Sequence, residues 1–363
     1  MNIHLFLIPF IIILGLFFSN NKNNGRKSYI IIVCLVLMLI IALRSTNIGY
    51  QQGSDVGNYA KAFDDIKSYS WQELWNLMLS GIGTSNDRGF FLLQKAIRCI
   101  TSNFHIYSFL ASSIFFVPFG IFLFLYSTNT KQLIFAFVFV TVMYFPHLMS
   151  GARQVYAVGF VWIAFTFFLR KKYLYTLFCI ILASIIHFSS ILILLPILMS
   201  TFITHNKIIK IIHLVTLFLV PVVMFQANSI IIFMGNSIGS DKYAEYGKNG
   251  LMGGTGIFIT IITLLSLFCF IAIKEKDIDN NEFLRKLYVM APCFTFFAPL
   301  IYSNGSMIRI SEYFYLFLAL LFPFAIEHFF DKKSANTLYI ITISILSIWT
   351  IVGNSNNYYF YWQ

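Results

Sequence analysis

Apolar stretches separated by short polar segments recur from one end of this chain to the other. A helix of about 20 apolar residues spans the hydrocarbon core of a bilayer, and about a dozen stretches approach that length. The pattern predicts an all-α, polytopic integral membrane protein with about 12 transmembrane helices, within a range of about 10–13. The predicted spans are 3–18, 29–43, 104–126, 132–149, 154–169, 173–187, 188–203, 211–225, 254–273, 287–303, 310–328 and 337–353.

The composition leaves no room for a soluble domain. Hydrophobic residues make up 58% of the 363 residues and charged residues 11%, with a mean hydropathy of +0.78, whereas a soluble domain carries about 25% charged residues. We therefore expect a single transmembrane domain over 1–363, with outer loops at about 44–103 and 226–253. In the first loop, the short apolar segment 89–100 carries Lys95 and Arg98 and is predicted to be an interfacial helix.

Loop charges orient the predicted helices. Cytoplasmic loops of membrane proteins are enriched in Lys and Arg, and the main basic clusters here fall on one face. Both termini then lie on the outer side of the membrane. The net charge of +11 is explained by cytoplasmic anchoring and anionic lipid, without nucleic acid. The clusters are Lys22/Arg26/Lys27, Arg170/Lys171/Lys172, Lys274/Lys276/Arg285/Lys286 and Lys332/Lys333.

One segment decides this orientation. Residues 173–203 could form one long helix or two short ones that meet near His187. A single helix would move the later basic clusters to the outer face, so the charge rule favours two crossings. Each crossing would have only about 15 residues, whereas about 17–25 are usual.

Under this topology, a set of polar residues gathers on the outward face. An arginine at membrane depth costs at least about 2.5 kcal/mol, so it usually faces a cavity and has a partner. The guanidinium group presents a planar fork of donors suited to phosphate oxygens. Several arginines at helix ends on one face therefore predict an anion site. The set is Arg44, Asp55, Tyr59, Asp87, Arg88, His147, Arg153, Gln154, His187, Ser189, Ser190, Arg309, Glu312 and Tyr313.

Each of these residues also has a simpler interpretation. Arg44 or Arg309 alone could extend to the lipid headgroups. His187 lies between Ile186 and Phe188 in an apolar run, where a single histidine usually serves packing or hydrogen bonding. The anion site depends on the set sharing one face. The five cysteines show no C-x-x-C spacing, which argues against disulfides and thiolate metal sites.

The ordered motifs of this set resemble the EpsG-like family, which contains Wzy-type O-antigen and exopolysaccharide polymerases. The similarity covers nearly the whole chain. The chain departs from the family pattern at 50–53, which look like an expansion before Asp55. The motifs are Arg44…Gly49…Asp55…Tyr59, Asp87-Arg88-Gly89-Phe90, Gly151-Ala152-Arg153-Gln154, His187-Phe188-Ser189 and Arg309-Ile310-Ser311-Glu312-Tyr313-Phe314.

The resemblance implies a glycosyltransferase on the outer leaflet of the inner membrane. Such an enzyme moves the growing glycan from undecaprenyl pyrophosphate onto an incoming lipid-linked repeat unit. A chain-length regulator and a flippase are the candidate partners that it implies. No cofactor and no metal are expected, because arginines can stabilise the pyrophosphate leaving group electrostatically.

We assign roles within this hypothesis as follows. Arg153 and Arg309 bind the pyrophosphate, and Arg44 either contacts the second carrier lipid or pairs with Asp55. His187 lies near the acceptor hydroxyl and is one candidate for the general base. Asp55 and Glu312 are the other candidate bases. The remaining substrate-binding candidates are Tyr59, Arg88, Gln154, Ser189 and Tyr313.

Three other functions compete with this hypothesis. Asp277-Ile278-Asp279 matches the D-x-D pattern of glycosyltransferases that use nucleotide sugars, but it lies in a mixed-charge segment typical of a solvated loop. A flippase or small-molecule transporter would show inverted repeats and broken helices. An O-antigen ligase would show a larger outer domain. The sugars, their linkage, the stereochemistry and the oligomeric state are not encoded in any of these patterns.

Overall fold

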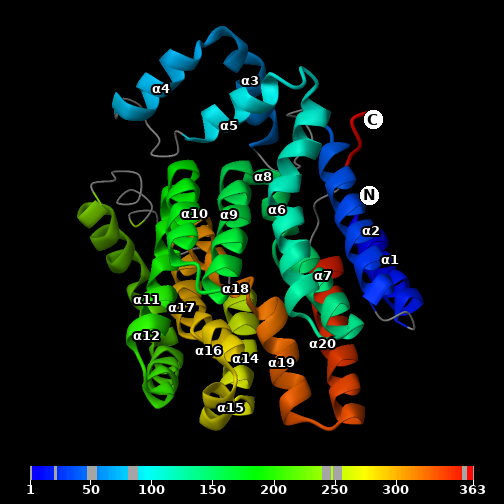
Figure 1. Ribbon diagram of the computed structural model, residues 1–363, viewed down its shortest axis with the longest axis vertical. Coiled ribbons are helices and arrows are strands. Elements are labelled where there is room, and N and C mark those ends of the chain that lie inside the picture. The colour runs from blue at the N-terminus through cyan, green and yellow to red at the C-terminus, as the bar shows by residue number, and fades with distance from the viewer. Residues whose placement is uncertain are drawn as a thin grey trace. The chain divides into compact units, whose positions relative to one another are not determined.

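The predicted apolar stretches form helices. A helix that is hydrophobic all round is either buried in a protein core or spans a membrane. The computed structural model describes residues 2–19, 23–46, 55–80, 89–238, 247, 256–353 and 358–362. In these ranges every regular element is helical, and the single β-bridge joins Arg44 and Phe360. The chain divides into two compact units, Met1–Ile191 with Thr337–Gln363 (unit 1) and Leu192–Asn336 (unit 2). Figure 1 shows the helices of both units.

Unit 1 is built on a series of packed helices. α2 (Asn23–Ala42) packs on α6 (Phe104–Tyr126), α6 on α9 (Ala152–Leu169), and α9 on α10 (Tyr173–Ile186). Asn2 Nδ2 donates to the Ile351 carbonyl, so the first described residues lie beside the end of α20. The other elements of this series are α1 (His4–Phe18), α7 (Thr130–Met143), α8 (Phe145–Ser150), the 3₁₀ helix η2 (Phe188–Ile193) and the part of α20 (Lys332–Gly353) from Thr337.

Three short helices form a layer at one end of unit 1 (Figure 1). They are α3 (Val56–Asp65), α4 (Trp71–Ser80) and α5 (Gly89–Arg98), with the 3₁₀ turn η1 (Ile66–Ser68). A capping box starts α4, because Ser70 N donates to Glu73 and Glu73 N donates to the Ser70 hydroxyl. The segment 89–100, predicted to be a helix, contains α5, and its position at the membrane interface stays a prediction.

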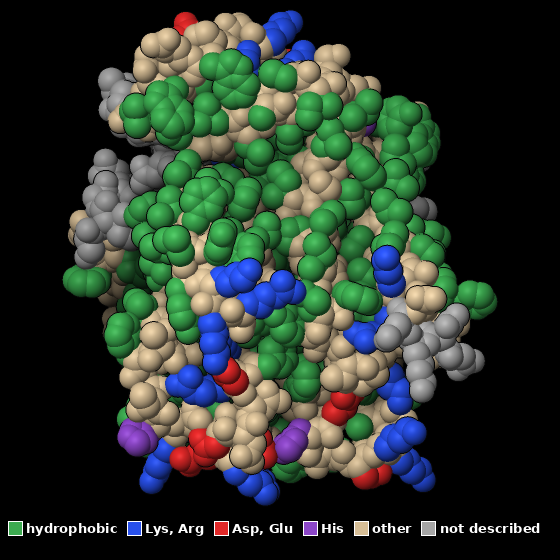
Figure 2. Space-filling view, in the orientation of Figure 1, with side chains coloured by type: hydrophobic (Ala, Val, Ile, Leu, Met, Phe, Trp, Pro, Cys, Tyr) green, Lys and Arg blue, Asp and Glu red, His purple; other side chains and the backbone are tan. Residues whose placement is uncertain are grey.

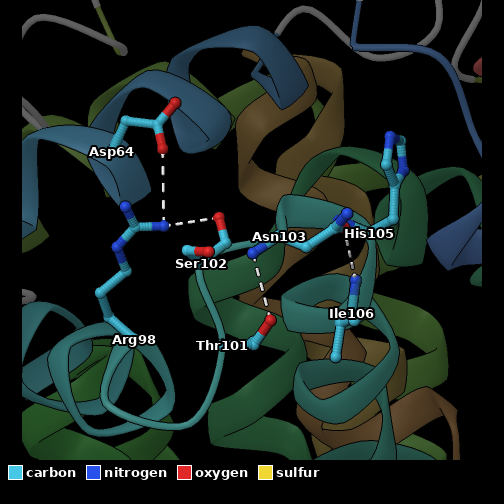
Figure 3. A network of polar contacts seen from close by, with 7 residues as sticks. All are labelled: Asp64, Arg98, Thr101, Ser102, Asn103, His105 and Ile106. Carbon is cyan, nitrogen blue, oxygen red and sulfur yellow. Dashed lines mark hydrogen bonds and ion pairs between the residues drawn. The ribbon is translucent and has the colours of Figure 1, made fainter.

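Polar contacts attach this layer to α6 (Figure 3). Arg98 Nη1 of α5 lies 3.6 Å from Asp64 Oδ1 of α3 and donates to the Ser102 carbonyl at 2.6 Å. The Arg98 guanidinium also lies over the Phe63 ring at 4.8 Å. Asn103 Oδ1 then accepts from the first backbone N–H groups of α6, as a helix N-cap does. These contacts attach the layer to the start of α6.

Unit 2 consists of helices packed around the middle of α12 (Asn206–Ile238). α12 contacts α14 (Gly256–Ala272) and α17 (Met290–Phe297), and α14 contacts α19 (Leu318–Phe329). The other elements are α11 (Leu194–Phe202), α15 (Glu275–Asn280), α16 (Glu282–Tyr288), η3 (Ala298–Tyr302), η4 (Gly305–Met307) and α18 (Ile308–Tyr315).

A buried polar network joins the helices of unit 2. His213 is fully buried, and its Nδ1 lies 2.7 Å from Tyr288 Oη while its Nε2 lies 2.8 Å from Ser266 Oγ. The Ser266 hydroxyl in turn lies 2.5 Å from the Thr295 hydroxyl. Both ring nitrogens of His213 are thereby satisfied, so the network connects α12, α14, α16 and α17.

Replacing His213 with Leu is expected to destabilise the protein by about 1–3 kcal/mol, because it leaves the Tyr288 hydroxyl buried without its partner. The double variant with Tyr288→Phe should recover part of this loss, with a coupling of about 0.6–1.7 kcal/mol, as for hydrogen bonds inside other membrane proteins. Reversible unfolding in mixed micelles measures all four corners of the cycle. Strict additivity would show that the two groups do not interact.

The helices support a multi-pass membrane protein. Among the residues that the structure describes, six helices are long and apolar enough to cross a bilayer, and a seventh candidate is the pair 305–315 and 318–329, bent by 53°. Five shorter apolar helices occupy the remaining predicted spans. Figure 2 shows hydrophobic side chains over much of the face in view. The number of about 12 crossings, the outer position of both termini and the single domain stay predictions.

Several helices begin five or six residues before the predicted spans, and three further differences concern where helices end or break. α12 continues to Ile238, well past the predicted end at 225, so 226–238 is helical and not part of a loop. The span 132–149 breaks at Tyr144 into α7 and α8, and the span 310–328 breaks between α18 and α19. A break at His187 was predicted and is confirmed, because α10 ends there with extended backbone. Whether each half crosses the membrane stays a prediction.

Candidate active site

Arg44 lies just beyond the end of α2, at the wall of a small cavity. Its side chain is 5% exposed although it ends an apolar helix. The cavity has a volume of about 20 Å³, and a site of this size holds about one water molecule. Its walls come from five helices of unit 1 (α2, α3, α6, α8 and α9), so distant parts of the sequence meet here. The lining residues are Ile41, Arg44, Tyr59, Phe104, Tyr107, Ser108, Ser112, Leu148, Ala152, Val155 and Tyr156.

The guanidinium group of Arg44 is not fully paired. Its Nε and Nη1 atoms are buried and have no hydrogen-bond partner among the residues that the structure describes. Burial lowers the pKa of Arg44 to about 10, so the group stays charged at neutral pH. A buried charge with unused donors is costly, and such groups usually coordinate a partner or a ligand.

Two tyrosines that line the cavity, Tyr107 and Tyr156, form a hydrogen-bonded chain with Gln94 of α5. Gln94 Nε2 donates to Tyr107 Oη at 3.2 Å, and the hydroxyls of Tyr107 and Tyr156 lie 3.0 Å apart. Gln94 is fully buried, and its Oε1 has no partner in the described part of the chain. The sequence prediction missed all three residues. Tyr156 lies one helical turn after the predicted Arg153, and this spacing could have indicated that Tyr156 shares its face.

Arg153 and Gln154 lie in the first turn of α9, between the cavity-lining residues Ala152 and Val155. Gln154 is 2% exposed. Tyr59 is 8% exposed and lines the same cavity from α3. Unit 1 therefore brings Arg44, Tyr59 and the turn that carries Arg153 together.

His187 lies at the same end of unit 1. α9 and α10 form a hairpin whose turn is at 170–172, so the end of α10 returns to the start of α9. His187 Nδ1 lies 2.9 Å from Ser189 Oγ, and both side chains are buried. This contact fixes the orientation of the ring. Gly89 of α5 packs against Ile185, which places the layer of short helices beside this end.

The other predicted residues belong to other elements. Asp55 is the N-cap residue of α3 and is partly exposed. Arg309, Glu312 and Tyr313 lie on one face of α18 in unit 2, where Glu312 and Tyr313 are buried. The joint action of Arg309 with Arg153 stays a prediction. Asp87 and Arg88 lie outside the described residues.

The D-x-D carboxylates have structural contacts. Asp277 Oδ2 accepts from the Lys274 backbone N–H at 2.8 Å and lies 2.9 Å from His328 Nε2. Asp279 Oδ1 accepts from Asn206 Nδ2 at 2.5 Å. The first carboxylate caps α15 and the second attaches α15 to α12. The described residues contain no group of three or more His, Cys, Asp or Glu side chains that could hold a metal ion.

Comparison with known proteins agrees with the motifs. No curated protein and no solved structure matches the chain. A protein-family model does match, the EpsG family, and the match covers residues 27–363. This range includes every predicted site residue and nearly the whole chain. The resemblance seen in the motifs is therefore confirmed, and the chain belongs to the EpsG family.

Proposed function

We propose that this protein is a polysaccharide polymerase that extends a glycan on undecaprenyl pyrophosphate at the periplasmic face of the inner membrane. Membership of the EpsG family supports a polymerase-like role in the membrane. The observation that carries the proposal is the buried, charged and incompletely paired guanidinium of Arg44, beside the turn that carries Arg153. A charged guanidinium group of this kind can stabilise the negative charge that develops on a pyrophosphate leaving group.

The reaction in this proposal needs one bond to form and one to break. The acceptor hydroxyl attacks the anomeric carbon of the growing glycan, and the bond from that carbon to the pyrophosphate breaks. Arg44 and Arg153 stabilise the departing pyrophosphate, and His187 accepts the proton of the hydroxyl. For this role, Nδ1–H of His187 donates to Ser189 Oγ, which leaves the Nε2 lone pair as the base.

The cavity must widen for this reaction. Its volume of about 20 Å³ suits one water molecule and not a diphosphate. Tyr59 of α3 forms one wall, and α3 belongs to the layer of short helices and not to the long ones. We therefore propose that the layer moves away from the cavity when the lipid-linked substrate enters.

Ser189→Ala should slow chain extension by about 3–10-fold, the equivalent of one hydrogen bond of about 1 kcal/mol. His187→Ala should slow it by about 10²–10⁴-fold, as expected for loss of a general base. Ser190→Ala is the matched control, because the Ser190 hydroxyl contacts Ser184 and not the imidazole. Single-turnover assays with extracted lipid-linked repeat units give these rates. Equal effects of the two serine variants would remove Ser189 from the mechanism.

A flippase is the second candidate, because the 53° bend between 305–315 and 318–329 is a broken helix of the kind seen in transporters. The glycan profile of a deletion strain separates the two functions. A polymerase is supported if long chains disappear while single repeat units still reach the lipid anchor. Loss of the single units as well would point to a flippase or a ligase.

A further inference from the structure

The segment Tyr358–Trp362 pairs with the chain on both sides of Arg44. Ser45 N donates to the Tyr359 carbonyl and Tyr361 N donates to the Leu43 carbonyl, each at 2.9 Å. Arg44 and Phe360 form the antiparallel bridge between these two bonds. Residues that are more than 300 positions apart thus hold the backbone of Arg44 from both directions.

The same segment caps the end of α2. The last carbonyl groups of a helix have no partner within the helix. Tyr358 Oη donates to the Ile40 carbonyl at 2.5 Å, and Tyr361 supplies the bond to Leu43. His105 Nδ1 donates to the Ala42 carbonyl at 2.7 Å, and its ring packs on Tyr361 at 4.5 Å. These contacts take the place of a local cap.

The cap determines where the Arg44 side chain goes. No glycine follows α2 directly to end it with a local turn. An arginine at an uncapped helix end is free to extend to the headgroups, where its charge is hydrated. Bridged on both sides, Arg44 instead has extended backbone and projects into the cavity, where its charge is buried.

We propose that the 358–362 segment is a positioning element that holds Arg44 in the cavity for the anionic part of the substrate. This inference rests on the proposed function, since Arg44 is its site. Tyr358 and Tyr361 act through Arg44 and do not touch the reacting atoms. Docking of the segment therefore sets the affinity for the pyrophosphate-linked substrate.

Docking is tested first without any activity. Ser45 and Tyr359 lie opposite each other in the bridge, where Cα atoms are about 5.5 Å apart, which suits a disulfide. A Ser45→Cys/Tyr359→Cys variant should cross-link in membranes on mild oxidation. The background is Cys99→Ser, because the other four native cysteines are buried. Ser45→Cys/Tyr361→Cys is the off-register control. No preferential cross-linking of the 45–359 pair would overturn the proposal.

Positioning is tested by a matched pair of variants. Tyr361→Ala and Tyr361→Pro both lose the ring, but only proline also loses the N–H that binds the Leu43 carbonyl. The substrate is lipid-linked repeat units from a polymerase-deletion strain. The KM of Tyr361→Pro should be about 10-fold higher than that of Tyr361→Ala, which corresponds to a loss of about 1.4 kcal/mol of binding free energy. In an Arg44→Lys background this difference should disappear, which a general loss of stability would not produce.

The outcomes separate the two hypotheses. If the two Tyr361 variants behave alike although the cross-link forms, the segment docks but does not position Arg44, and the inference is wrong. If Arg44→Ala has normal activity, the proposed role of the cavity is wrong whatever the cross-link shows. A KM difference that persists in the Arg44→Lys background would assign the segment a role other than positioning Arg44.

Discussion

Arg44→Ala is expected to abolish chain extension while the protein remains in the membrane. Removing one donor that stabilises a developing negative charge typically lowers kcat by about 10²–10³-fold, and the donor here is charged. The expected glycan profile is a ladder reduced to single repeat units. Arg153→Ala should give the same result. The measurement is the glycan profile of a complemented deletion strain, with the protein level determined in parallel.

Stability distinguishes a substrate-binding Arg44 from a structural one. Its charge is buried, and two of its donors are unpaired among the described residues. An apolar replacement therefore removes the desolvation cost of a buried charge. Arg44→Met should therefore leave the thermal midpoint unchanged or raise it, while activity is lost. Arg170→Ala is the control, because Arg170 is exposed at the opposite end of α9. Normal long-chain glycan from a well-expressed Arg44→Met protein, or a sharp fall in its stability, would contradict the proposed role.

Hydropathy predicted where helices lie but not where they break. The span 104–126 matches α6 at both ends, because polar residues flank it. The bend between α18 and α19 and the break at Tyr144 fall inside continuous apolar runs, where periodicity carries no information. The break at His187 was predictable only because the basic loops require an even number of crossings there.

The residues around Arg44 show a similar limit of sequence-based prediction at the candidate site. Arg44 and Arg153 were predicted from the cost of charge at membrane depth, which is a local property. Tyr107 and Tyr358 were not predicted, because a tyrosine in an aromatic-rich membrane protein has no distinctive pattern until the fold places it. The pairing of 43–45 with 359–361 joins opposite ends of the sequence. Such contacts depend on tertiary packing and leave no periodic signal.

Gly159→Ala is expected to disrupt the packing of α6 against α9 in unit 1. A Cβ at Gly159 would overlap the Ile114 carbonyl oxygen and lie 2.7 Å from the Ile114 carbonyl carbon. Small residues at such crossings allow the backbones of membrane helices to approach each other. Because the obstacle is backbone, α6 and α9 must separate, at a cost of at least about 2 kcal/mol. Gly256→Ala is the control, since nothing lies within 4 Å of that position.

A second glycine shows what distinguishes a backbone clash from a side-chain clash. A Cβ at Gly15 would meet only side-chain atoms at close range, among them Ile134 Cδ1 at 2.6 Å. Truncation of Ile134 to Ala, which removes both Cγ1 and Cδ1, should therefore relieve Gly15→Ala, whereas Ile114→Ala should not relieve Gly159→Ala. Thermal unfolding of the four variants in detergent tests this contrast. Because α6 carries Tyr107 and α9 carries Tyr156, separating the helices should also break their 3.0 Å contact in the Arg44 cavity. Rescue of Gly159→Ala by Ile114→Ala would show that the two backbones are not in contact.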